Sequence, residues 1–315
     1  MDQPSSDERD YDFSNFSSHS SSSNGQDGQW NNNDAIDVLK PKILNEALKH
    51  FPHISENNFN VLFKLNLDQT AKAILLAKTV MPTGTAGQEN RLIRNCLVWI
   101  YWCRHYPSYA TLGTLFGLSK TRAKRIIKVQ CRNMSMRIND FVSLHNADTL
   151  DGFFLPGCVG AVDSTELEIY AWVGDAYSGK AKCFTVKYQV TVCLVTKKPI
   201  HIFGPSFGKE ADTTQWVRSE LADWLELNDL WVVGDKGYVG CRRVKHCLKK
   251  RAGQLNLPLE SKEYNKNISR KRVFVENHFA DLKNFKVLSH TFRGQLDEHV
   301  HVFYCCEILL ALSRA

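Results

Sequence analysis

The stretch Cys158-Val-Gly-Ala-Val-Asp163 marks a change of period in this chain and decides its fold class. Upstream of residue 148 apolar residues recur at helical spacing, whereas from here they form short runs that are typical of buried strands. The five residues before Asp163 are apolar or small, which predicts a buried strand that ends at Asp163. Residues 167–170 either continue this strand or form the next one.

Further strand-like and helix-like segments follow downstream. Residues 184–195 are rich in β-branched side chains and carry Lys187 and Gln189 on one face. The pattern predicts two more strands at residues 199–203 and 230–234, the latter ending at Asp235, and two helices at residues 211–225 and 272–288. Strands followed by a helix, a strand and a helix predict a mixed α/β sheet with helices on its faces.

Three acids in this region are candidate metal ligands. Asp163 and Asp235 each follow a predicted buried strand, and Glu276 shares one face of a predicted helix with Arg272 and Lys283. Taken singly, such an aspartate usually forms a turn, and such a glutamate usually forms surface ion pairs. Together the three can converge at one edge of the sheet, where hard carboxylate oxygens suit two Mg²⁺ ions for phosphodiester chemistry.

Residues 90–139 contain ten basic residues and no acid. They are Arg91, Arg94, Arg104, Lys120, Arg122, Lys124, Arg125, Lys128, Arg132 and Arg137. The 315-residue chain has a net charge of +7, and residues 1–34 carry −6, which leaves +13 on the remainder, with +10 in this stretch. A solvated helix face normally mixes both signs of charge, so the run favours DNA as a partner.

The same stretch has the pattern of a helix-turn-helix. Residues 109–116 predict a first helix, and residues 120–131 predict a second one. Between them, Gly117-Leu-Ser119 predicts a tight turn in which Ser119 caps the second helix. Its inward-facing residues are expected to be Ile126, Ile127 and Val129, with the basic residues facing outward. The second helix of such a motif enters the major groove of DNA, and an ordinary helical hairpin is the alternative.

These patterns divide the chain into three regions. Residues 1–34 are rich in Ser, Asn and Asp and poor in aliphatic side chains, so we expect them to be disordered. Residues 35–148 are expected to form an all-α DNA-binding region with the helix-turn-helix at residues 109–132. Residues 149–315 are expected to form the α/β domain.

Local signals place boundaries within the helical region. Ser55 and Asp68 are each followed by helically spaced apolar residues, so they are expected to cap helices. Pro82, Gly84 and Gly87 predict a loop.

Other classes of protein find little support in the sequence. The longest apolar runs, such as residues 97–102, are far shorter than the ~18 residues of a membrane helix. Ten cysteines without a CxxC pair or a secretory leader indicate a reduced, intracellular protein, and a zinc site of Cys241, His246 and Cys247 lacks a second ligand pair. The chain also lacks the glycine-rich nucleotide loops and the G-x-S-x-G elbow.

Several motifs together resemble the DDE transposases of the Harbinger and related bacterial insertion-sequence group. They are Gly160-Ala-Val-Asp-Ser-Thr-Glu166, Tyr177-Ser-Gly-Lys-Ala-Lys-Cys-Phe-Thr-Val-Lys-Tyr-Gln189, Gly234-Asp-Lys-Gly-Tyr238 and Arg272-Val-Phe-Val-Glu-Asn-His-Phe-Ala-Asp-Leu-Lys-Asn-Phe-Lys-Val-Leu288. The segments His105-Tyr-Pro-Ser-Tyr109 and Phe116-Gly-Leu-Ser-Lys120 resemble the helix-turn-helix that precedes the catalytic domain of that group. The resemblance covers roughly residues 55–312.

The resemblance implies an RNase H-like catalytic domain with Asp163, Asp235 and Glu276 as the DDE triad. By that analogy each active site binds two Mg²⁺ or Mn²⁺ ions, with Asp163 bridging both and Asp235 and Glu276 holding one each. In one position the chain departs from the group, which usually carries Arg-His where this chain has Cys183-Phe184. The departure removes one expected cation near the substrate and leaves the three acids intact.

Ten basic residues are expected to contact DNA phosphates. Five lie on the second helix of the helix-turn-helix and five near the acids: Lys120, Arg122, Lys124, Arg125 and Lys128, and Lys180, Lys187, Lys236, Arg272 and Lys283. The implied function is a transposase that binds transposon ends in double-stranded DNA, hydrolyses a phosphodiester and joins the freed strand to target DNA.

Two other functions stay open: a domesticated, transposase-derived protein that binds or cuts DNA in a host role, and a non-transposing RNase H-like nuclease. A reaction on two DNA ends implies a homodimer or a larger assembly. An accessory DNA-binding protein, as eukaryotic Harbinger elements use, is left open. No membrane partner is expected.

The Ser- and Asn-rich tail favours a eukaryotic host and therefore the nucleus. In a bacterium the location would be the cytoplasm or nucleoid. Lys249-Lys250-Arg251 and Arg270-Lys271-Arg272 are candidate nuclear import signals.

Overall fold

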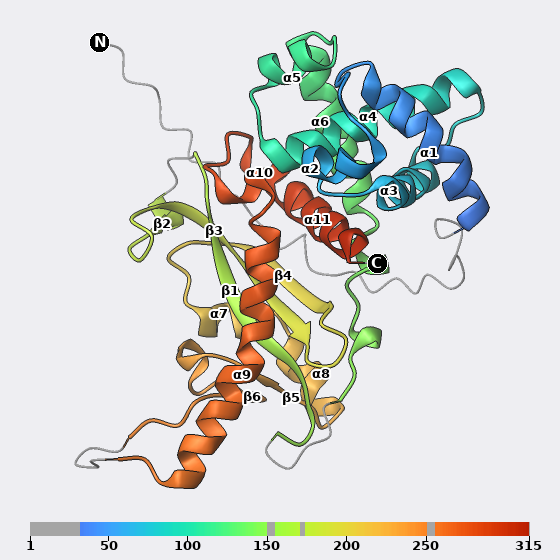
Figure 1. The fold of residues 1–315 in the computed structure, drawn as a ribbon. Coiled ribbons are helices and arrows are strands. Elements are labelled where there is room, and N and C mark those ends of the chain that lie inside the picture. The colour runs from blue at the N-terminus through green and yellow to red at the C-terminus, as the bar shows by residue number, and fades with distance from the viewer. Residues whose placement is uncertain (1–31, 150–154, 171–173, 251–255, 315) are drawn as a thin grey trace, which may run out of the picture.

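The computed structural model describes residues 32–149, 155–170, 174–250 and 256–314. Figure 1 shows helices from the first half of the chain gathered at one end of the molecule and a twisted sheet, crossed by one long helix, at the other. The last helix, in red, lies among the helices of the first half. The expected mixed α/β class with a helical N-terminal region is confirmed.

Six α-helices precede the sheet in the described part of the chain. They are α1 (Asn33–Leu48), α2 (Phe59–Phe63), α3 (Leu67–Val80), α4 (Ala86–His105), α5 (Tyr109–Leu115) and α6 (Lys120–Ser135). Asn32 caps α1, so helix begins within the segment that was expected to be disordered. The rest of that segment, residues 1–31, lies outside the described residues.

The cap of α3 differs from the expectation. Asn66, not Asp68, caps this helix: its side chain accepts a hydrogen bond from the Gln69 N–H at 2.8 Å, and the Gln69 side chain accepts one from the Asn66 N–H at 3.0 Å. This reciprocal pair satisfies two donors that a helix start leaves open. Asp68 lies in the first turn, where a negative charge favours the helix dipole.

Of two other predicted boundaries in the helical region, the cap at Ser55 is confirmed and the loop at residues 82–87 is only partly confirmed. Ser55 starts a 3-10 turn that leads into α2, as its capping role predicted. The expected loop is shorter than predicted, because α4 begins at Ala86 and includes Gly87, whereas Pro82 and Gly84 lie outside helices.

The described strands form one mixed sheet. They are β1 (Cys158–Glu168), β2 (Tyr177–Ser178), β3 (Cys183–Cys193), β4 (Pro199–Phe207), β5 (Trp231–Val233) and β6 (Val244–Lys245). Their order is β2-β3-β1-β5-β6, with β4 paired to β3. The long β1 is antiparallel to β3 and parallel to β5, and β5 is parallel to β6.

The first strand extends further than expected. β1 does not end at Asp163 but runs on to Glu168, so of the two alternatives for residues 167–170 the structure confirms continuation of the same strand, as far as Glu168. This part pairs with β3 in an unbroken register. Polar residues face polar residues across the ladder, as in Ser164 opposite Gln189 and Glu166 opposite Lys187. Pairing with β3, and not an apolar run of its own, therefore stabilises the polar second half of β1 as a strand.

The described helices that follow β1 in the chain also differ in length from the predicted ones. They are α7 (Asp212–Arg218), α8 (Leu221–Leu227), α9 (Leu259–Leu282), α10 (Lys286–Ser289) and α11 (Leu296–Ser313). The single helix expected at residues 211–225 is broken at Glu220, whose φ of 56° is left-handed and ends a continuous helix. The helix expected at residues 272–288 begins much earlier, at Leu259, and stops at Leu282.

One of two buried hydrophobic clusters joins the helical end to the sheet, and the buried residues of the other, which include Val162 and Trp216, all lie in the α/β region. The joining cluster includes Ile36 of α1, Val190 of β3 and Leu312 of α11. α11 packs against α6 and α3, so the expected boundary between residues 148 and 149 does not separate two cores. Within the described residues, no helix combines the length and the apolar character needed to cross a bilayer.

Buried aromatic contacts join α11 to the sheet. The rings of Tyr188 on β3 and Phe303 on α11 stack with their centroids 3.8 Å apart. The Tyr188 hydroxyl lies 2.8 Å from Nδ1 of His299, which is fully buried. Burial lowers the pKa of His299 to about 3, so this histidine is neutral in the fold.

We predict that His299 weakens the fold in acid. The pKa in the fold is lowered from 6.5, so the unfolded chain takes up a proton that the fold cannot, and the free energy of unfolding falls as the pH drops below about 6.5. His299→Gln removes the titrating group and should flatten this fall by up to about 1.4 kcal/mol per pH unit, measured by urea unfolding at several pH values. Tyr188→Phe keeps the imidazole and should keep the fall. An identical pH dependence in wild type and His299→Gln would refute the assignment.

Candidate active site

Asp163 and Asp235 lie next to each other where β5 ends beside β1. The two strands run parallel with Ala161 opposite Val233, and each aspartate follows its paired residue by two positions. The Asp235 carboxylate accepts a hydrogen bond from the Gly237 N–H at 2.6 Å, which fixes the turn after β5. The sheet register thus brings together two of the three acids singled out in the sequence.

Burial raises the pKa of the Asp163 carboxyl above its usual value. The neighbouring carboxylates of Asp235 and Asp212 raise this pKa further, whereas the Ser164 N–H and the Arg272 guanidinium lower it. Negative charge is therefore concentrated at this point of the sheet, and it attracts cations.

The third acid, Glu276, reaches the site from α9. A stripe of buried apolar residues holds this helix on β1: Val275, Phe279 and Leu282. Nη2 of Arg272, one helical turn before Glu276, lies 3.2 Å from Oε1 of Glu276 and 3.6 Å from Oδ2 of Asp163. One guanidinium therefore joins two of the three carboxylates, and its Nε atom is buried with no hydrogen-bond partner.

A fourth acid, Asp212 at the start of α7, belongs to the same site and was missed by the sequence analysis. A Cβ added at Gly237 would lie 2.8 Å from Oδ1 of Asp235 and 3.0 Å from Oδ2 of Asp212, so both carboxylates crowd this glycine. Asp212 pairs with the ammonium of Lys187 at 2.8 Å. The available signal was Lys187 itself, because a lysine on a largely apolar strand needs an acidic partner when it is buried.

Buried hydrogen bonds support the strand beneath Asp163. The Ser164 hydroxyl donates to the Gln215 side-chain oxygen at 2.9 Å and lies 3.1 Å from the Tyr238 hydroxyl. The Gln189 side-chain amide donates to the same hydroxyl at 3.2 Å. These polar groups tie β1, β3, α7 and the turn after Asp235 together, which limits movement of the acids.

The five cations expected near the acids have different surroundings. Lys187 is not free for a phosphate, because it is buried and its ammonium also donates to the Glu210 carbonyl at 2.9 Å. Lys236 is exposed beside Asp235, and Arg272 bridges the acids. Burial lowers the pKa of Lys283; nearby Glu166 raises it and Lys180 lowers it, so these three form a separate group.

The expected helix-turn-helix elements are present as α5, a turn and α6. The Ser119 hydroxyl caps α6 by accepting the Arg122 N–H at 3.2 Å, and the Leu118 N–H donates to the Gly113 carbonyl at 2.7 Å. A Cβ at Gly113 would lie 2.4 Å from the Leu118 carbonyl oxygen, so the tight turn requires this glycine. The inward face was predicted correctly for Ile126 and Ile127 but not for Val129, which is 44% exposed.

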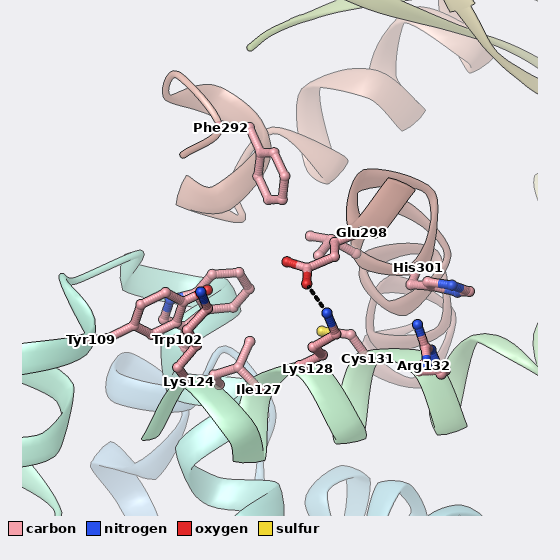
Figure 2. A pocket seen from close by; sticks show the side chains of 11 residues that line it. Trp102, Tyr109, Lys124, Ile127, Lys128, Cys131, Arg132, Phe292, Glu298 and His301 are labelled. Carbon is pink, nitrogen blue, oxygen red and sulfur yellow. Dashed lines mark ion pairs between the residues drawn. The ribbon is translucent and has the colours of Figure 1, made fainter. Parts of the chain in front are cut away.

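All five cations expected on α6 are exposed: Lys120, Arg122, Lys124, Arg125 and Lys128. Lys128 differs from the others because it also reaches toward α11, where its ammonium pairs with Glu298 at 2.7 Å (Figure 2). This ion pair spans a small pocket between the two helices that Tyr109 and His301 also line. Lys128 therefore fastens α6 to the C-terminal helix.

The carboxylate oxygens are the type of ligand that a hard divalent cation takes, because Mg²⁺ and Mn²⁺ prefer such oxygens. As the side chains lie, no group of three or more His, Cys, Asp or Glu within the described ranges is arranged around one metal position. The guanidinium of Arg272 lies between Asp163 and Glu276 and supplies positive charge to both carboxylates. A bound cation would share these carboxylates only if Arg272 withdrew from them.

Comparison with known proteins agrees with this class of site. A family model described as DDE superfamily endonuclease matches residues 162–311. A "probable transposase for insertion sequence element IS702" from Microchaete diplosiphon is 30% identical over 202 residues, which cover 62% of this chain and 70% of the relative. The chain therefore belongs to the DDE superfamily of endonucleases and transposases.

A second relative extends the comparison. A transposase assigned to insertion sequence element IS112 of Streptomyces albus G is 27% identical over 195 residues, again 62% of this chain and 70% of the relative. No solved structure gives a significant match.

We predict that Arg272 competes with divalent cations. Arg272→Ala should bind Mn²⁺ about fivefold more tightly without DNA, because removing a partly exposed ion pair of ~1 kcal/mol frees the carboxylates. Isothermal titration calorimetry measures this affinity, and Arg272→Lys, which keeps the charge, serves as the matched control. Unchanged or weaker Mn²⁺ binding by Arg272→Ala would show that the guanidinium does not compete.

Proposed function

We propose that this chain is a DDE transposase that cuts DNA at the ends of a mobile element, with Asp163, Asp235 and Glu276 as its catalytic acids. The observation that carries the proposal is that Asp163 on β1 lies beside Asp235 at the end of β5 and shares Arg272 with Glu276 of α9. These acids lie in the segment that matches the endonuclease family. An RNase H-like topology and a place among Harbinger-type elements are parts of the same proposal.

In the proposed reaction a water oxygen attacks a DNA phosphorus atom and the bond from phosphorus to the 3′ oxygen breaks. The products are a 3′-hydroxyl and a 5′-phosphate, and the proton lost by water balances the one gained by the leaving oxygen. Two divalent cations, when bound, activate the attacking oxygen and stabilise the leaving one. In the second step the 3′-hydroxyl attacks a phosphorus atom of the target strand, and the bond from that phosphorus to its own 3′ oxygen breaks. The proton lost by the attacking hydroxyl balances the one gained by the leaving 3′ oxygen, so the two DNAs are joined and a new 3′-hydroxyl is left in the target.

The chain's own residues supply the rest of the chemistry. Asp163, Asp235 and Glu276 would hold the cations. The hydrogen bonds beneath Asp163 limit the movement of the strand that carries this aspartate. Asp212 adds negative charge and is fixed by Lys187. Arg272, which lies between Asp163 and Glu276, would bind a substrate phosphate at this site, and its planar fork suits a phosphate better than a lysine ammonium does.

Binding of the DNA ends is assigned to α5 and α6. The exposed cations of α6 form the phosphate-binding and base-reading face, and Lys128 holds that helix on α11. Synapsis of two ends calls for at least two copies of the chain, and the nucleus of a eukaryotic host is the proposed location.

We predict that the triad acids are required for cleavage. Asp163→Asn and Glu276→Gln keep side-chain shape but remove ligand charge, so cleavage of DNA with Mg²⁺ or Mn²⁺ should fall at least about a thousandfold, equivalent to several kcal/mol of lost charge stabilisation. The matched control is Asp175→Asn, which alters an exposed acid paired with Lys209. Undiminished cleavage by Asp163→Asn would defeat the proposal.

We predict that α6 sets the salt dependence of duplex binding. Replacing Arg122, Lys124 and Arg125 by Ala should reduce the slope of log affinity against log salt by up to ~2.7, because each lost phosphate contact contributes ~0.9. Replacing the exposed Lys49, Lys198 and Lys209 removes the same charge elsewhere and should change the slope far less. Equal slopes for both triple variants would argue against α6 as the DNA-binding helix.

A further inference from the structure

A basic cleft opens directly beside the acids. Its volume is about 640 Å³, and it lies between the first half of α9 and the chain that follows β6. Asp235 and Arg272 stand at its border with the active site. The other lining residues are Lys236, Cys247, Leu248, Lys249, Lys250, Leu257, Asn265 and Ser269.

The two walls of this cleft are held together by side-chain contacts. The Asn265 side chain accepts a hydrogen bond from the Leu248 N–H at 2.7 Å and donates one to the Leu248 carbonyl at 3.0 Å. Sγ of Cys247 lies 3.8 Å from the Ser269 hydroxyl. The segment after β6 is thus fixed to α9, so the cleft is a built feature of the fold.

The charge of the cleft is strongly one-sided. Among the lining residues that the structure describes, four are basic, Lys236, Lys249, Lys250 and Arg272, and Asp235 is the only acid. Arg272 is paired with Asp163 and Glu276, so the three lysines supply the positive charge of the cleft itself. Lys236, Lys249 and Lys250 are exposed to solvent. Such a surface binds a polyanion, and its position beside the acids indicates the polyanion on which those acids act.

We propose that this cleft binds a single strand of DNA through its phosphates and leads it to the carboxylates. The proposal rests on the proposed function, because it identifies the form of DNA that the same site takes. It also gives Lys249 and Lys250, singled out in the sequence as an import signal, a role in the folded protein.

Size and chemistry favour a single strand over a duplex. A cleft of 640 Å³ has the volume of a small-ligand site, which suits a few nucleotides of one strand better than a duplex. No aromatic ring occurs among the described lining residues, so bases have no surface on which to stack. Binding through the backbone alone is independent of sequence, so short oligo(dT) and oligo(dA) strands should bind with similar affinity.

The experiment uses the full chain in EDTA, where no cleavage occurs, with oligo(dT) and a duplex of the same length as probes. Iodoacetamide labelling of Cys247 in the cleft is followed by mass spectrometry, and Cys183 and Cys241, which have similar exposure outside the cleft, are internal references. Affinity is measured across salt concentrations. The test variant is Lys249→Ala/Lys250→Ala, and the matched control is Lys49→Ala/Lys198→Ala.

We expect oligo(dT) to slow alkylation of Cys247 and to leave Cys183 and Cys241 unchanged. The Lys249→Ala/Lys250→Ala variant should lose this protection, bind about tenfold more weakly and show a salt slope smaller by ~1.4, since each contact to a single strand contributes ~0.7. Unprotected Cys247 in the wild type, or wild-type affinity and slope in the variant, would overturn the proposal. Equal protection by the duplex would overturn the choice of a single strand.

The outcomes also separate this proposal from the proposed function. Asp163→Asn should still protect Cys247, because Asp163 is not among the residues that line the cleft and the three lysines remain. A wild type that protects Cys247 but never cleaves DNA would contradict the catalytic assignment alone. A wild type that cleaves DNA without protecting Cys247 would contradict the cleft alone.

Discussion

The balance of charge where β5 ends beside β1 governs the arrangement of the surrounding structure. Asp163 lies among the carboxylates of Asp235 and Asp212, and burial makes the negative charge of Asp163 costly. Two cations offset this charge from opposite sides: Lys187 from β3 and Arg272 from α9. Because these acids and cations come from five different elements, the position of α7 and of α9 on the sheet is tied to keeping this cluster paired.

The sequence predicted the acids more reliably than their surroundings. Apolar runs before Asp163 and Asp235 and the apolar stripe beside Glu276 are local patterns, so they located all three residues on the correct elements. The end of β1 was misplaced because its polar half is a strand only through pairing with β3. Asp212 carried no local signal, since its role follows from tertiary contact with Lys187 and with the turn at Gly237.

The helical end shows the same limit. The glycine turn and the Ser119 cap predicted α5 and α6 closely, because capping and turn chemistry act over a few residues. The periodic pattern could not show that Lys128 turns to Glu298 or that Val129 faces solvent, because both depend on where α11 packs. That packing joins residues far apart in the chain, which local periodicity does not encode.

The place of α11 has a consequence for the order in which the chain becomes structured during synthesis. The helices that carry the basic face leave the ribosome early, but the helix that completes their core is made after the whole sheet. Nascent α6 therefore exposes apolar surface, including Ile127, until residues 296–313 emerge. The packing of α6 against α11 is thus delayed until the residues of the sheet and of α9 have been made. The helical end can therefore complete its core only after the α/β region has been synthesised.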